Sequence, residues 1–250
     1  MSWTDLKAIE NFSKLSKEFN ISTLVETGTF RAQGARVMSS IFKQVLSCEI
    51  NTKYYRDACY KTMEIPNVKV IHQDSTEFLS FISATFKEPL LYYLDAHFYD
   101  ASLPKEERFT VKKELQSIQP NNNSIIIIHD FDTKNGLGHL IYDDIHLDFN
   151  IVKEELQKIN NNFNYYVNYK EACKIVTAND FISRKLLPLE LDSENIDSLD
   201  FIWSHPFKTY RGILYCIPKE LNLLNYELYR VYYDEYINYG RNSWDRVINC

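Results

Sequence analysis

Residues 24–36 read LVETGTFRAQGAR, and this stretch decides the fold. An apolar run ends at Glu26, the chain turns at Gly28, and a segment with helical spacing begins at Gly34. A strand, a glycine turn and a helix in this order make up the first half of a βαβ unit. Free N–H groups at the start of such a helix attract a carboxylate or a phosphate. The stretch therefore predicts a ligand at this turn.

The same alternation continues along the chain. Short apolar runs typical of strands occupy residues 21–27, 44–50, 67–73, 89–97, 124–131, 162–169 and 211–218. Segments with helical spacing lie at residues 34–43, 51–63, 75–86, 110–119 and 150–160. Strands that are apolar throughout are buried on both faces, as in a parallel sheet covered by helices. The pattern predicts an α/β fold, a doubly wound, mostly parallel, seven-stranded Rossmann-like sheet.

A chain of 250 residues is expected to form one large domain with an appendage. Residues 1–218 are predicted to form the domain. An insertion that contains an acidic loop is predicted at about 170–210, near the last two strands. Residues 219–250 are predicted to be a tyrosine-rich helical extension that packs on the domain or forms a homodimer contact. Its packing face would hold Tyr226, Tyr229, Tyr233 and Tyr236.

Composition excludes several classes of protein. A net charge of -6 argues against an electrostatic grip on nucleic acid. The apolar runs are far shorter than the roughly 20 residues that span a bilayer. The charged N-terminal residues are unlike a signal peptide, and five cysteines without CxxC spacing indicate neither a disulfide framework nor a zinc site. A cytoplasmic setting is expected, with Cys48 and Cys216 as small core residues.

Each of the first five apolar runs has an acidic residue at its carboxyl end. The residues at these ends are Glu26, Glu49, Asp74, Asp95 with His97, and His129 with Asp130. In a parallel sheet, ligands bind at the carboxyl ends of the strands. Glu49 follows the glycine turn by about 20 residues, the spacing at which an acid accepts hydrogen bonds from a ribose. The set predicts a ligand that contains a nucleoside.

The glycine pattern limits which nucleoside ligand is expected. A nicotinamide dinucleotide needs G-x-G-x-x-G, with glycines close together to admit its pyrophosphate. Here Ala32 lies between Gly28 and Gly34, and no tight glycine trio is present. The turn favours a ligand without a pyrophosphate, and a nicotinamide-dependent oxidoreductase is the least favoured function.

The motifs VETGTFRAQGA, SCEIN, VIHQDSTEFL, YYLDAHFYD and IIIIHDF together resemble those of class I S-adenosylmethionine-dependent methyltransferases. ETGTF, LDAH and IHDF are most similar to small-molecule O-methyltransferases of the macrocin methyltransferase and cephalosporin hydroxylase type. The resemblance covers residues 21–132 and the last two strands. It implies transfer of a methyl group to a hydroxyl of a small molecule, with a carbohydrate as one candidate acceptor.

The resemblance also implies roles for particular residues. Glu26 and Gly28 would line the methionine end of the cofactor, Glu49 would bind the ribose, and Asp74 would face the adenine. The implied set of cofactor-binding residues is Glu26, Gly28, Thr29, Phe30, Glu49, Asp74, Ser75 and Asp95.

Three residues are candidates for catalysis. Transfer to a hydroxyl needs a group that takes its proton, and His97 is the first candidate because an unperturbed imidazole titrates near neutrality. His129 is the second candidate, as base or ligand, and Asp95 shares their strand ends. The resemblance implies a divalent metal at Asp95 and Asp130, where oxygen ligands favour Mg²⁺ over zinc. His129 stands where the family would place an acid.

The segment after the fifth run leaves two readings open. Residues 132–144, DTKNGLGHLIYDD, contain Gly136, Gly138 and His139, and they form either a mobile loop over the acceptor pocket or an ordinary surface loop. Other histidines are expected to pack without a functional role: His72, His146 and His205.

Other functions remain compatible with these motifs. The same cofactor also serves transfer to nitrogen and transfer of the aminocarboxypropyl group. A domain of this fold that only binds a ligand or a partner protein is a further alternative, because the second glycine of the usual turn is absent and the insertion is long and acidic.

Overall fold

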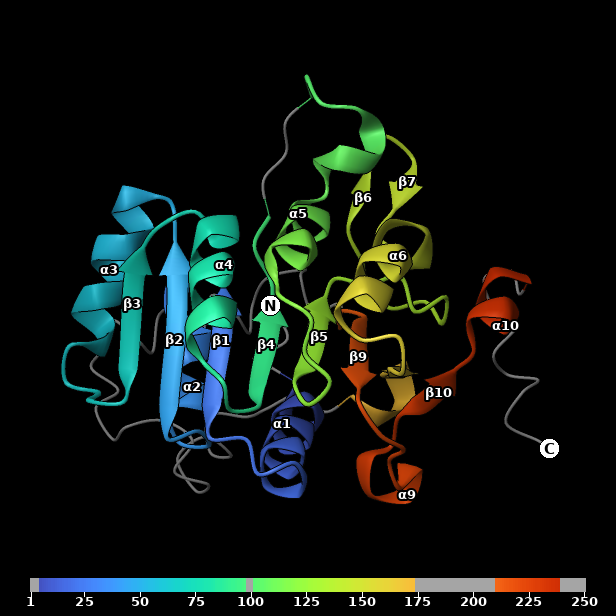
Figure 1. The fold of residues 1–250 in the computed structure, drawn as a ribbon, viewed down its shortest axis with the longest axis horizontal. Coiled ribbons are helices and arrows are strands. Elements are labelled where there is room, and N and C mark those ends of the chain that lie inside the picture. The colour runs from blue at the N-terminus through green and yellow to red at the C-terminus, as the bar shows by residue number, and fades with distance from the viewer. Residues whose placement is uncertain (1–4, 98–100, 174–209, 239–250) are drawn as a thin grey trace.

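The computed structural model describes residues 5–97, 101–173 and 210–238 (Figure 1). The helices are α1 (Leu6–Glu18), α2 (Gln33–Met38), α3 (Thr52–Thr62), α4 (Ser75–Thr85), α5 (Thr110–Ser117), α6 (Phe149–Ile159), α9 (Leu223–Tyr226) and α10 (Tyr233–Asn238), with short 3-10 turns at Lys105–Arg108 and Lys170–Ala172. The strands are β1 (Thr23–Thr27), β2 (Gln44–Glu49), β3 (Val68–His72), β4 (Leu90–Leu94), β5 (Ile125–His129), β6 (Ile141–Tyr142), β7 (Ile145–His146), β8 (Asn164–Val167), β9 (Ile213–Ile217) and β10 (Tyr229–Val231).

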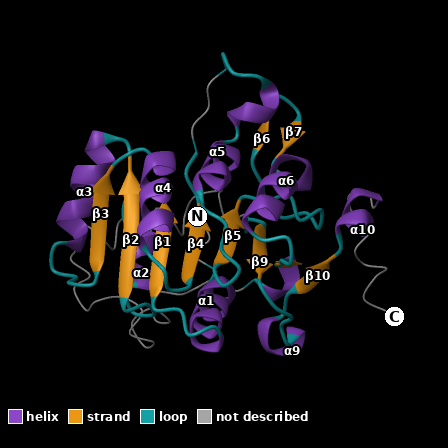
Figure 2. Ribbon diagram, viewed as in Figure 1, coloured by secondary structure: helices purple, strands orange, loops and turns teal. Residues whose placement is uncertain are grey.

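One sheet organises the molecule. It has eight strands in the order β10-β8-β9-β5-β4-β1-β2-β3, and β6 and β7 form a separate hairpin (Figure 2). Strands β1 to β5 pair in parallel, whereas β9 runs antiparallel to both β5 and β8. The predicted α/β fold with a mostly parallel, Rossmann-like sheet is confirmed.

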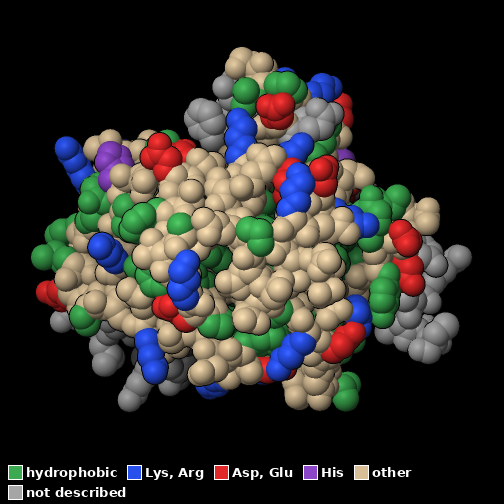
Figure 3. Space-filling model, viewed as in Figure 1, with side chains coloured by type: hydrophobic (Ala, Val, Ile, Leu, Met, Phe, Trp, Pro, Cys, Tyr) green, Lys and Arg blue, Asp and Glu red, His purple; other side chains and the backbone are tan. Residues whose placement is uncertain are grey.

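Helices cover both faces of this sheet. Helices α4, α5 and α6 lie over one face (Figure 1), where Phe78, Leu115 and Leu156 are buried in one core with strand side chains. Helices α1 and α2 cover the other face, where the ring of Phe12 meets Tyr93 edge-on at 5.4 Å. Burial on both faces explains why the strands are apolar throughout. Lys, Arg, Asp and Glu side chains are interspersed over the face that Figure 3 shows.

The order of the strands creates a switch point beside β1. Leu24 of β1 lies opposite Val45 of β2 on one side and opposite Leu91 of β4 on the other. The chain runs outward from β1 to β3 and then returns to β4, on the opposite side of β1. Loops that leave β1 and β4 at their carboxyl ends therefore diverge, and a crevice opens between them.

Two helix caps hold the loops of this edge. The side chain of Asn51 accepts hydrogen bonds from Lys53 N and Tyr54 N and so caps the start of α3. The side chain of Asp74 accepts from Thr76 N and so caps α4. Capping satisfies backbone donors that have no partner inside the helix.

The predicted C-terminal helix is wrong for the described residues. The segment forms two short helices, α9 and α10, with the strand β10 between them. Tyr229 lies in β10, which pairs antiparallel with β8 and adds the eighth strand, whereas Tyr226 and Tyr236 are buried in different helices. Tyrosine is enriched in strands, and a three-residue edge strand is too short for its periodicity to be read from sequence. Residues 239–250 of this segment lie outside the described residues.

Two other expectations differ in extent. The helix expected at 34–43 is limited to α2, which ends at Met38 and is followed by a turn. The insertion expected at about 170–210 lies almost entirely outside the described residues. None of the helices that the structure describes is both long enough and apolar enough to cross a bilayer.

Candidate active site

A cavity of about 900 Å³ lies at the carboxyl ends of β1 to β5, at the switch point. Predicted site residues that line it are Gly28, Phe30, Glu49, Asp74, Ser75, Asp95, His97, His129 and Asp130. Parallel strands end at the same edge of a sheet, so residues far apart in sequence meet here. Two predicted residues, Glu26 and Thr29, are not among the residues that line the cavity.

Gly28 brings the loops after β1 and β4 together. Its φ angle is +75°, and a Cβ atom there would lie 2.9 Å from the carbonyl oxygen of Asp95 and 3.0 Å from Ala96 Cα. Real Cβ atoms do not approach backbone this closely, and L residues disfavour this φ value. The glycine thus allows close approach of protein backbone, and it also lines the cavity.

Glu26 and Thr29 belong to a buried hydrogen-bond chain behind the cavity. Ser47 Oγ donates to Glu26 Oε2 at 2.6 Å and lies 2.6 Å from Thr29 Oγ1. Burial raises the pKa of Glu26 to about 8, and the Ser47 hydroxyl opposes the rise. Glu26 is therefore neutral at pH 7 and joins the ends of β1 and β2 from inside the sheet.

Glu49 lies at the cavity with both carboxylate oxygens held by backbone. Oε2 accepts a hydrogen bond from Phe30 N at 2.8 Å, and Oε1 accepts from Asn51 N at 2.8 Å. A carboxylate has about four lone-pair sites, so each oxygen can accept one more hydrogen bond. The side chain fixes the turn after β1. Its two oxygens can still accept hydrogen bonds from the two hydroxyls of a diol.

Asp74 and Ser75 form the next part of the lining, after β3. Asp74 Oδ1 accepts hydrogen bonds from the backbone N and the hydroxyl of Thr76. Oδ2 makes no hydrogen bond to any residue that the structure describes. The cap orients the carboxylate at the cavity wall and leaves one oxygen available to a ligand.

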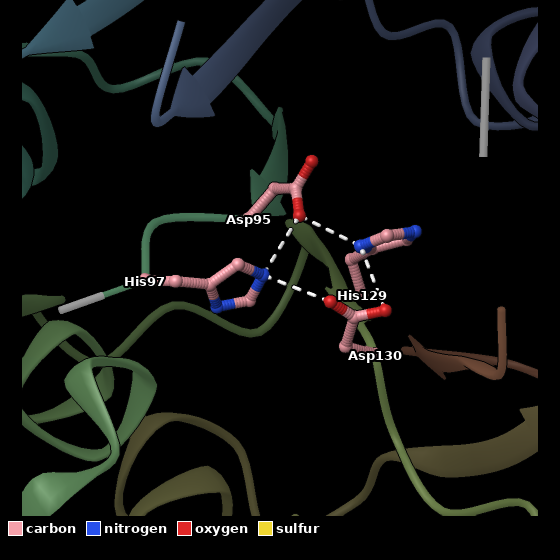
Figure 4. A group of neighbouring side chains, drawn as sticks. All are labelled: Asp95, His97, His129 and Asp130. Atoms are coloured by element: carbon pink, nitrogen blue, oxygen red, sulfur yellow. Dashed lines mark ion pairs between the residues drawn. The ribbon is translucent and has the colours of Figure 1, made fainter. Parts of the chain in front are cut away.

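A cluster of two acids and two histidines closes the cavity beside β4 and β5 (Figure 4). His129 Nδ1 lies 2.7 Å from Asp95 Oδ1, and His97 Nε2 lies 3.0 Å from Asp130 Oδ2 and 3.3 Å from Asp95 Oδ1. His129 is buried, whereas the His97 side chain is 34% exposed. His97 is thus the ring that a bound molecule can reach.

The charges of this cluster stabilise one another. Burial by itself would raise the pKa of Asp95. The rings of His129 and His97 outweigh burial and hold the pKa of Asp95 below its ordinary value. Burial also opposes the imidazolium of His97, yet Asp130 and Asp95 raise its pKa to about 10. The same two carboxylates raise the pKa of His129. At neutral pH His97 is therefore an imidazolium between two carboxylates, and it is not a free base.

The contact of His129 with Asp95 is close but not aligned as a hydrogen bond. Both ring nitrogens of His129 are buried and make no hydrogen bond to the described residues, although Nδ1 is 2.7 Å from Asp95 Oδ1. A buried polar group without a hydrogen bond is costly and recurs at functional sites. This ring is held in the cluster by charge contacts with Asp95 and Asp130 and not by an aligned hydrogen bond.

Asp130 is held in an unusual backbone conformation. Its φ angle is +57°, which is uncommon for residues other than glycine and persists where surrounding structure fixes it. Its backbone oxygen accepts a hydrogen bond from Leu140 N at 2.8 Å, and its Oδ1 lies 3.4 Å from Arg211 Nε. These contacts aim the side chain at His97.

Several residues at the cavity have no signal in the sequence pattern. Arg211 precedes β9, and only the antiparallel direction of β9 brings it to this edge. Glu114 of α5 does not line the cavity; it is fully buried, and burial raises its pKa to about 7. Further residues of the lining are Tyr54, Gln73, Glu107, Arg108 and Lys113.

The cluster fits Mg²⁺ poorly. Its four side chains can bring one ligand atom each within 4.8 Å of one another. Mg²⁺ requires near-octahedral oxygen ligands, whereas here imidazole nitrogens of His97 and His129 face the carboxylates. Each carboxylate is already paired with an imidazole. The donor set therefore does not support the expected Mg²⁺ site, and no catalytic step is assigned to that ion.

No known family and no curated protein matches the chain in sequence. Solved structures with a similar arrangement include the plantazolicin methyltransferase BamL in complex with a triazolic desmethylPZN analog and SAH, at 14% identity and TM-score 0.46, covering 85% of this chain and 84% of that one. An O-methyltransferase from Bacillus cereus in complex with SAH has 12% identity and TM-score 0.42, covering 85% and 81%. Magnesium protoporphyrin IX methyltransferase from Synechocystis PCC 6803 with bound SAM has 9% identity and TM-score 0.42, covering 84% and 76%.

Proposed function

We propose that the protein is a class I S-adenosylmethionine-dependent methyltransferase that acts on a hydroxyl of a small molecule. One observation carries the proposal: the acid after β2, the acid after β3 and the cluster after β4 and β5 line a single cavity at the switch point. Ligands of open α/β sheets bind at this place. The cavity volume lies in the range of small-molecule sites, roughly 300–1,000 Å³.

The cavity wall suggests how the cofactor would lie. Glu49, next to the turn at Phe30, would accept hydrogen bonds from the ribose hydroxyls. Asp74, with Ser75, would meet the amino group of the adenine through its available oxygen. The methionine end would then lie near Gly28 and Asp95, where the loops after β1 and β4 touch.

Methyl transfer needs positioning more than covalent catalysis. S-adenosylmethionine supplies a methyl group on a sulfonium, which an acceptor oxygen takes by in-line displacement while the electron pair of the broken bond stays on sulfur. The protein contributes by holding the acceptor in line and by excluding water. Asp95, ionised and partly buried, would favour a positive charge in this part of the cavity.

His97 is the group that would handle the acceptor hydroxyl. It is the accessible ring of the cluster, and its proton is held by Asp130 and Asp95. The hydroxyl proton has to leave as the bond to the methyl group forms; the neutral form of His97 would take it, whereas the imidazolium can only hold an acceptor oxygen that is already ionised. His97 becomes a base only when an acceptor separates it from a carboxylate. His129 and Asp95 would orient it.

A second candidate function is a domain that binds a ligand or a partner without catalysis. Both oxygens of Glu49 are held by backbone N–H groups, and Asp74 caps α4. Each acid therefore has a structural role that does not require a cofactor. Transfer to nitrogen, or of the aminocarboxypropyl group, uses the same cofactor pocket and differs in the acceptor.

Calorimetric titration of the protein with S-adenosylmethionine and S-adenosylhomocysteine tests the proposal. Saturable binding of either compound supports the pocket and justifies assays with hydroxylated acceptors, sugars included. No binding to folded protein would leave the non-catalytic domain as the better explanation. Methylation of an amine with no methylation of hydroxyls would replace the acceptor class and keep the cofactor.

A further inference from the structure

A second group of ligand-type side chains lies outside the cavity lining. Asp132 follows β5, His139 precedes β6, and His146 is the last residue of β7. Asp132 Oδ2 is 3.7 Å from His139 Nε2 and 3.7 Å from His146 Nδ1, and the two ring nitrogens are 2.5 Å apart. The sequence pattern assigned His146 a packing role, and none of the three residues lines the cavity.

The hydrogen bonds around this group direct lone pairs of His139 and Asp132 toward its centre, while His146 Nδ1 shares with His139 Nε2 a proton that an ion would displace. His139 Nδ1 lies 3.3 Å from the carbonyl oxygen of Leu137, which can only accept, so Nδ1 carries the proton. In a neutral ring, Nε2 then presents its lone pair to the group. Asp132 Oδ1 accepts from Lys134 N at 2.9 Å, so Oδ2 is the oxygen that faces the rings. A backbone partner on the far nitrogen is typical of histidines that bind metals.

Backbone hydrogen bonds hold the three residues as one unit. The hairpin pairs Ile141 with His146, and Leu147 N donates to Leu140 O at 3.0 Å. Asp132 N donates to Leu147 O at 2.7 Å, which ties the end of β5 to the hairpin. The ligand atoms are therefore positioned before any ion binds, and little ordering is needed on binding.

We propose that Asp132, His139 and His146 bind one borderline divalent transition-metal ion, of which Zn²⁺ is the representative. Two imidazoles and one carboxylate suit zinc or iron better than Mg²⁺ or Ca²⁺. Ligand atoms on one tetrahedral zinc ion lie roughly 3.3 Å apart, given bonds of about 2.0–2.1 Å. The 3.7, 3.7 and 2.5 Å separations bracket that value and need only small ring rotations. The rings stay partly exposed, at 11% and 27%, so an ion and water have access.

An ion at this place would act on the cavity through backbone. Leu140, beside His139, donates its N–H to the backbone oxygen of Asp130, the acid that faces His97. Fixing the hairpin would therefore help to hold Asp130 in its left-handed conformation. The role is a positioning one, because none of the three ligands reaches the cavity.

Metal content and titration of the full chain test the site. Chelator-treated protein should take up one Zn²⁺ per chain in calorimetry, and its melting temperature should rise. Co²⁺ in place of Zn²⁺ should give visible absorption bands of a site with nitrogen ligands. His139→Gln and His146→Gln should lose this binding. His72→Gln, a histidine in β3 remote from the group, is the matched control and should keep it.

A variant at the other histidine cluster separates the two candidate sites. His97→Gln should retain the one-to-one binding of Zn²⁺. Loss of binding in His97→Gln, with binding intact in His139→Gln and His146→Gln, would assign the ion to the cavity cluster and overturn the proposal. Absence of stoichiometric Zn²⁺ binding by the unmodified chain would also overturn the proposal. The contact between His139 and His146 would then be an N–H···N hydrogen bond only. The unmodified chain gives this answer even if a variant fails to fold, and the test does not depend on S-adenosylmethionine.

Discussion

His129 Nδ1 lies 2.7 Å from Asp95 Oδ1, across the ends of two neighbouring parallel strands. Their meeting follows from the register of the sheet, in which Leu94 of β4 pairs with Ile128 of β5, so that the next residue of each strand lies opposite. His97 and Asp130 complete the cluster from the loops that follow. The pairing of an acid with an imidazole at this edge underlies the predictions on catalysis.

Replacement of Glu49 or Asp74 should weaken binding of S-adenosylmethionine. In each of Glu49→Ala and Asp74→Ala, loss of a buried hydrogen bond to the cofactor should cost roughly 1–3 kcal/mol, which raises the dissociation constant by about 5–150-fold. Calorimetric titration measures the change. Asp74→Asn is the control for helix capping. Because asparagine caps a helix as well as aspartate does, this variant removes the carboxylate and keeps the cap of α4. Unchanged affinity in both alanine variants would show that the assigned pocket is wrong.

Replacement of Glu26 by glutamine should have a different effect. The pKa of Glu26 is raised from 4.5 to about 8, so its protonated form stabilises the folded state. That contribution is complete below about pH 4.5 and is lost as the pH rises through about 8. Glu26→Gln should therefore remove this loss and raise the melting temperature above pH 8, with cofactor affinity unchanged. Weaker cofactor binding in this variant would instead return Glu26 to the pocket.

Replacement of Gly28 by alanine should destabilise the fold more than the same change at Gly136. Both glycines have positive φ, and an alanine in the left-handed region costs roughly 1–2 kcal/mol. At Gly136 nothing lies within 4 Å of the added Cβ, whereas at Gly28 the Cβ meets the backbone of Asp95 and Ala96. Denaturant titration of both variants gives the difference in free energy of unfolding. Equal losses would contradict the contact between these loops.

Replacement of His97 by asparagine should lower kcat and leave cofactor affinity unchanged. A group that stabilises charge or moves a proton in the transition state contributes about 100-fold or more to the rate. The pH profile separates the two roles, since the pKa of His97 is about 10. Turnover that falls above about pH 10 indicates an imidazolium, and turnover that rises toward that pH indicates a base. A profile identical to that of the variant would remove His97 from catalysis.

The protonation of His97 should also appear in stability. Its pKa is raised from 6.5 to about 10, so the paired imidazolium contributes fully below about pH 6.5, and the contribution is lost as the pH rises through about 10. Melting temperatures measured across this interval should fall for the parent chain and fall less for His97→Asn. Because the side chain is 34% exposed, the effect will be screened by salt.

Addition of Mg²⁺ should leave cofactor affinity and turnover unchanged. The carboxylates of Asp95 and Asp130 are paired with imidazoles, and that donor set is poor for a hard ion. Titration with and without Mg²⁺ measures affinity, and an activity assay measures turnover. Activity that requires Mg²⁺ would mean that the ion displaces His97 from its acids.

Much of the fold could be predicted because its signals are local. The apolar run SIIIIH at residues 124–129 is buried throughout as β5, and parallel strands of this kind require helices on both faces. Acids placed after such runs meet at one edge, whatever the strand order, because parallel strands all end there. The grouping of Glu49, Asp74 and Asp95 around one edge therefore follows from the sequence.

The tertiary structure decided which side chains are available to a ligand. Glu26 and Glu49 both follow apolar runs, yet one is neutral and buried against Ser47 while the other lies at the cavity. Arg211 joins the site only because β9 runs antiparallel to β5. Asp132, His139 and His146 converge only because a two-strand hairpin folds back on the end of β5. Periodicity determines which residues of one segment share a face, whereas contacts between segments depend on strand order, direction and loop path, which no local pattern carries.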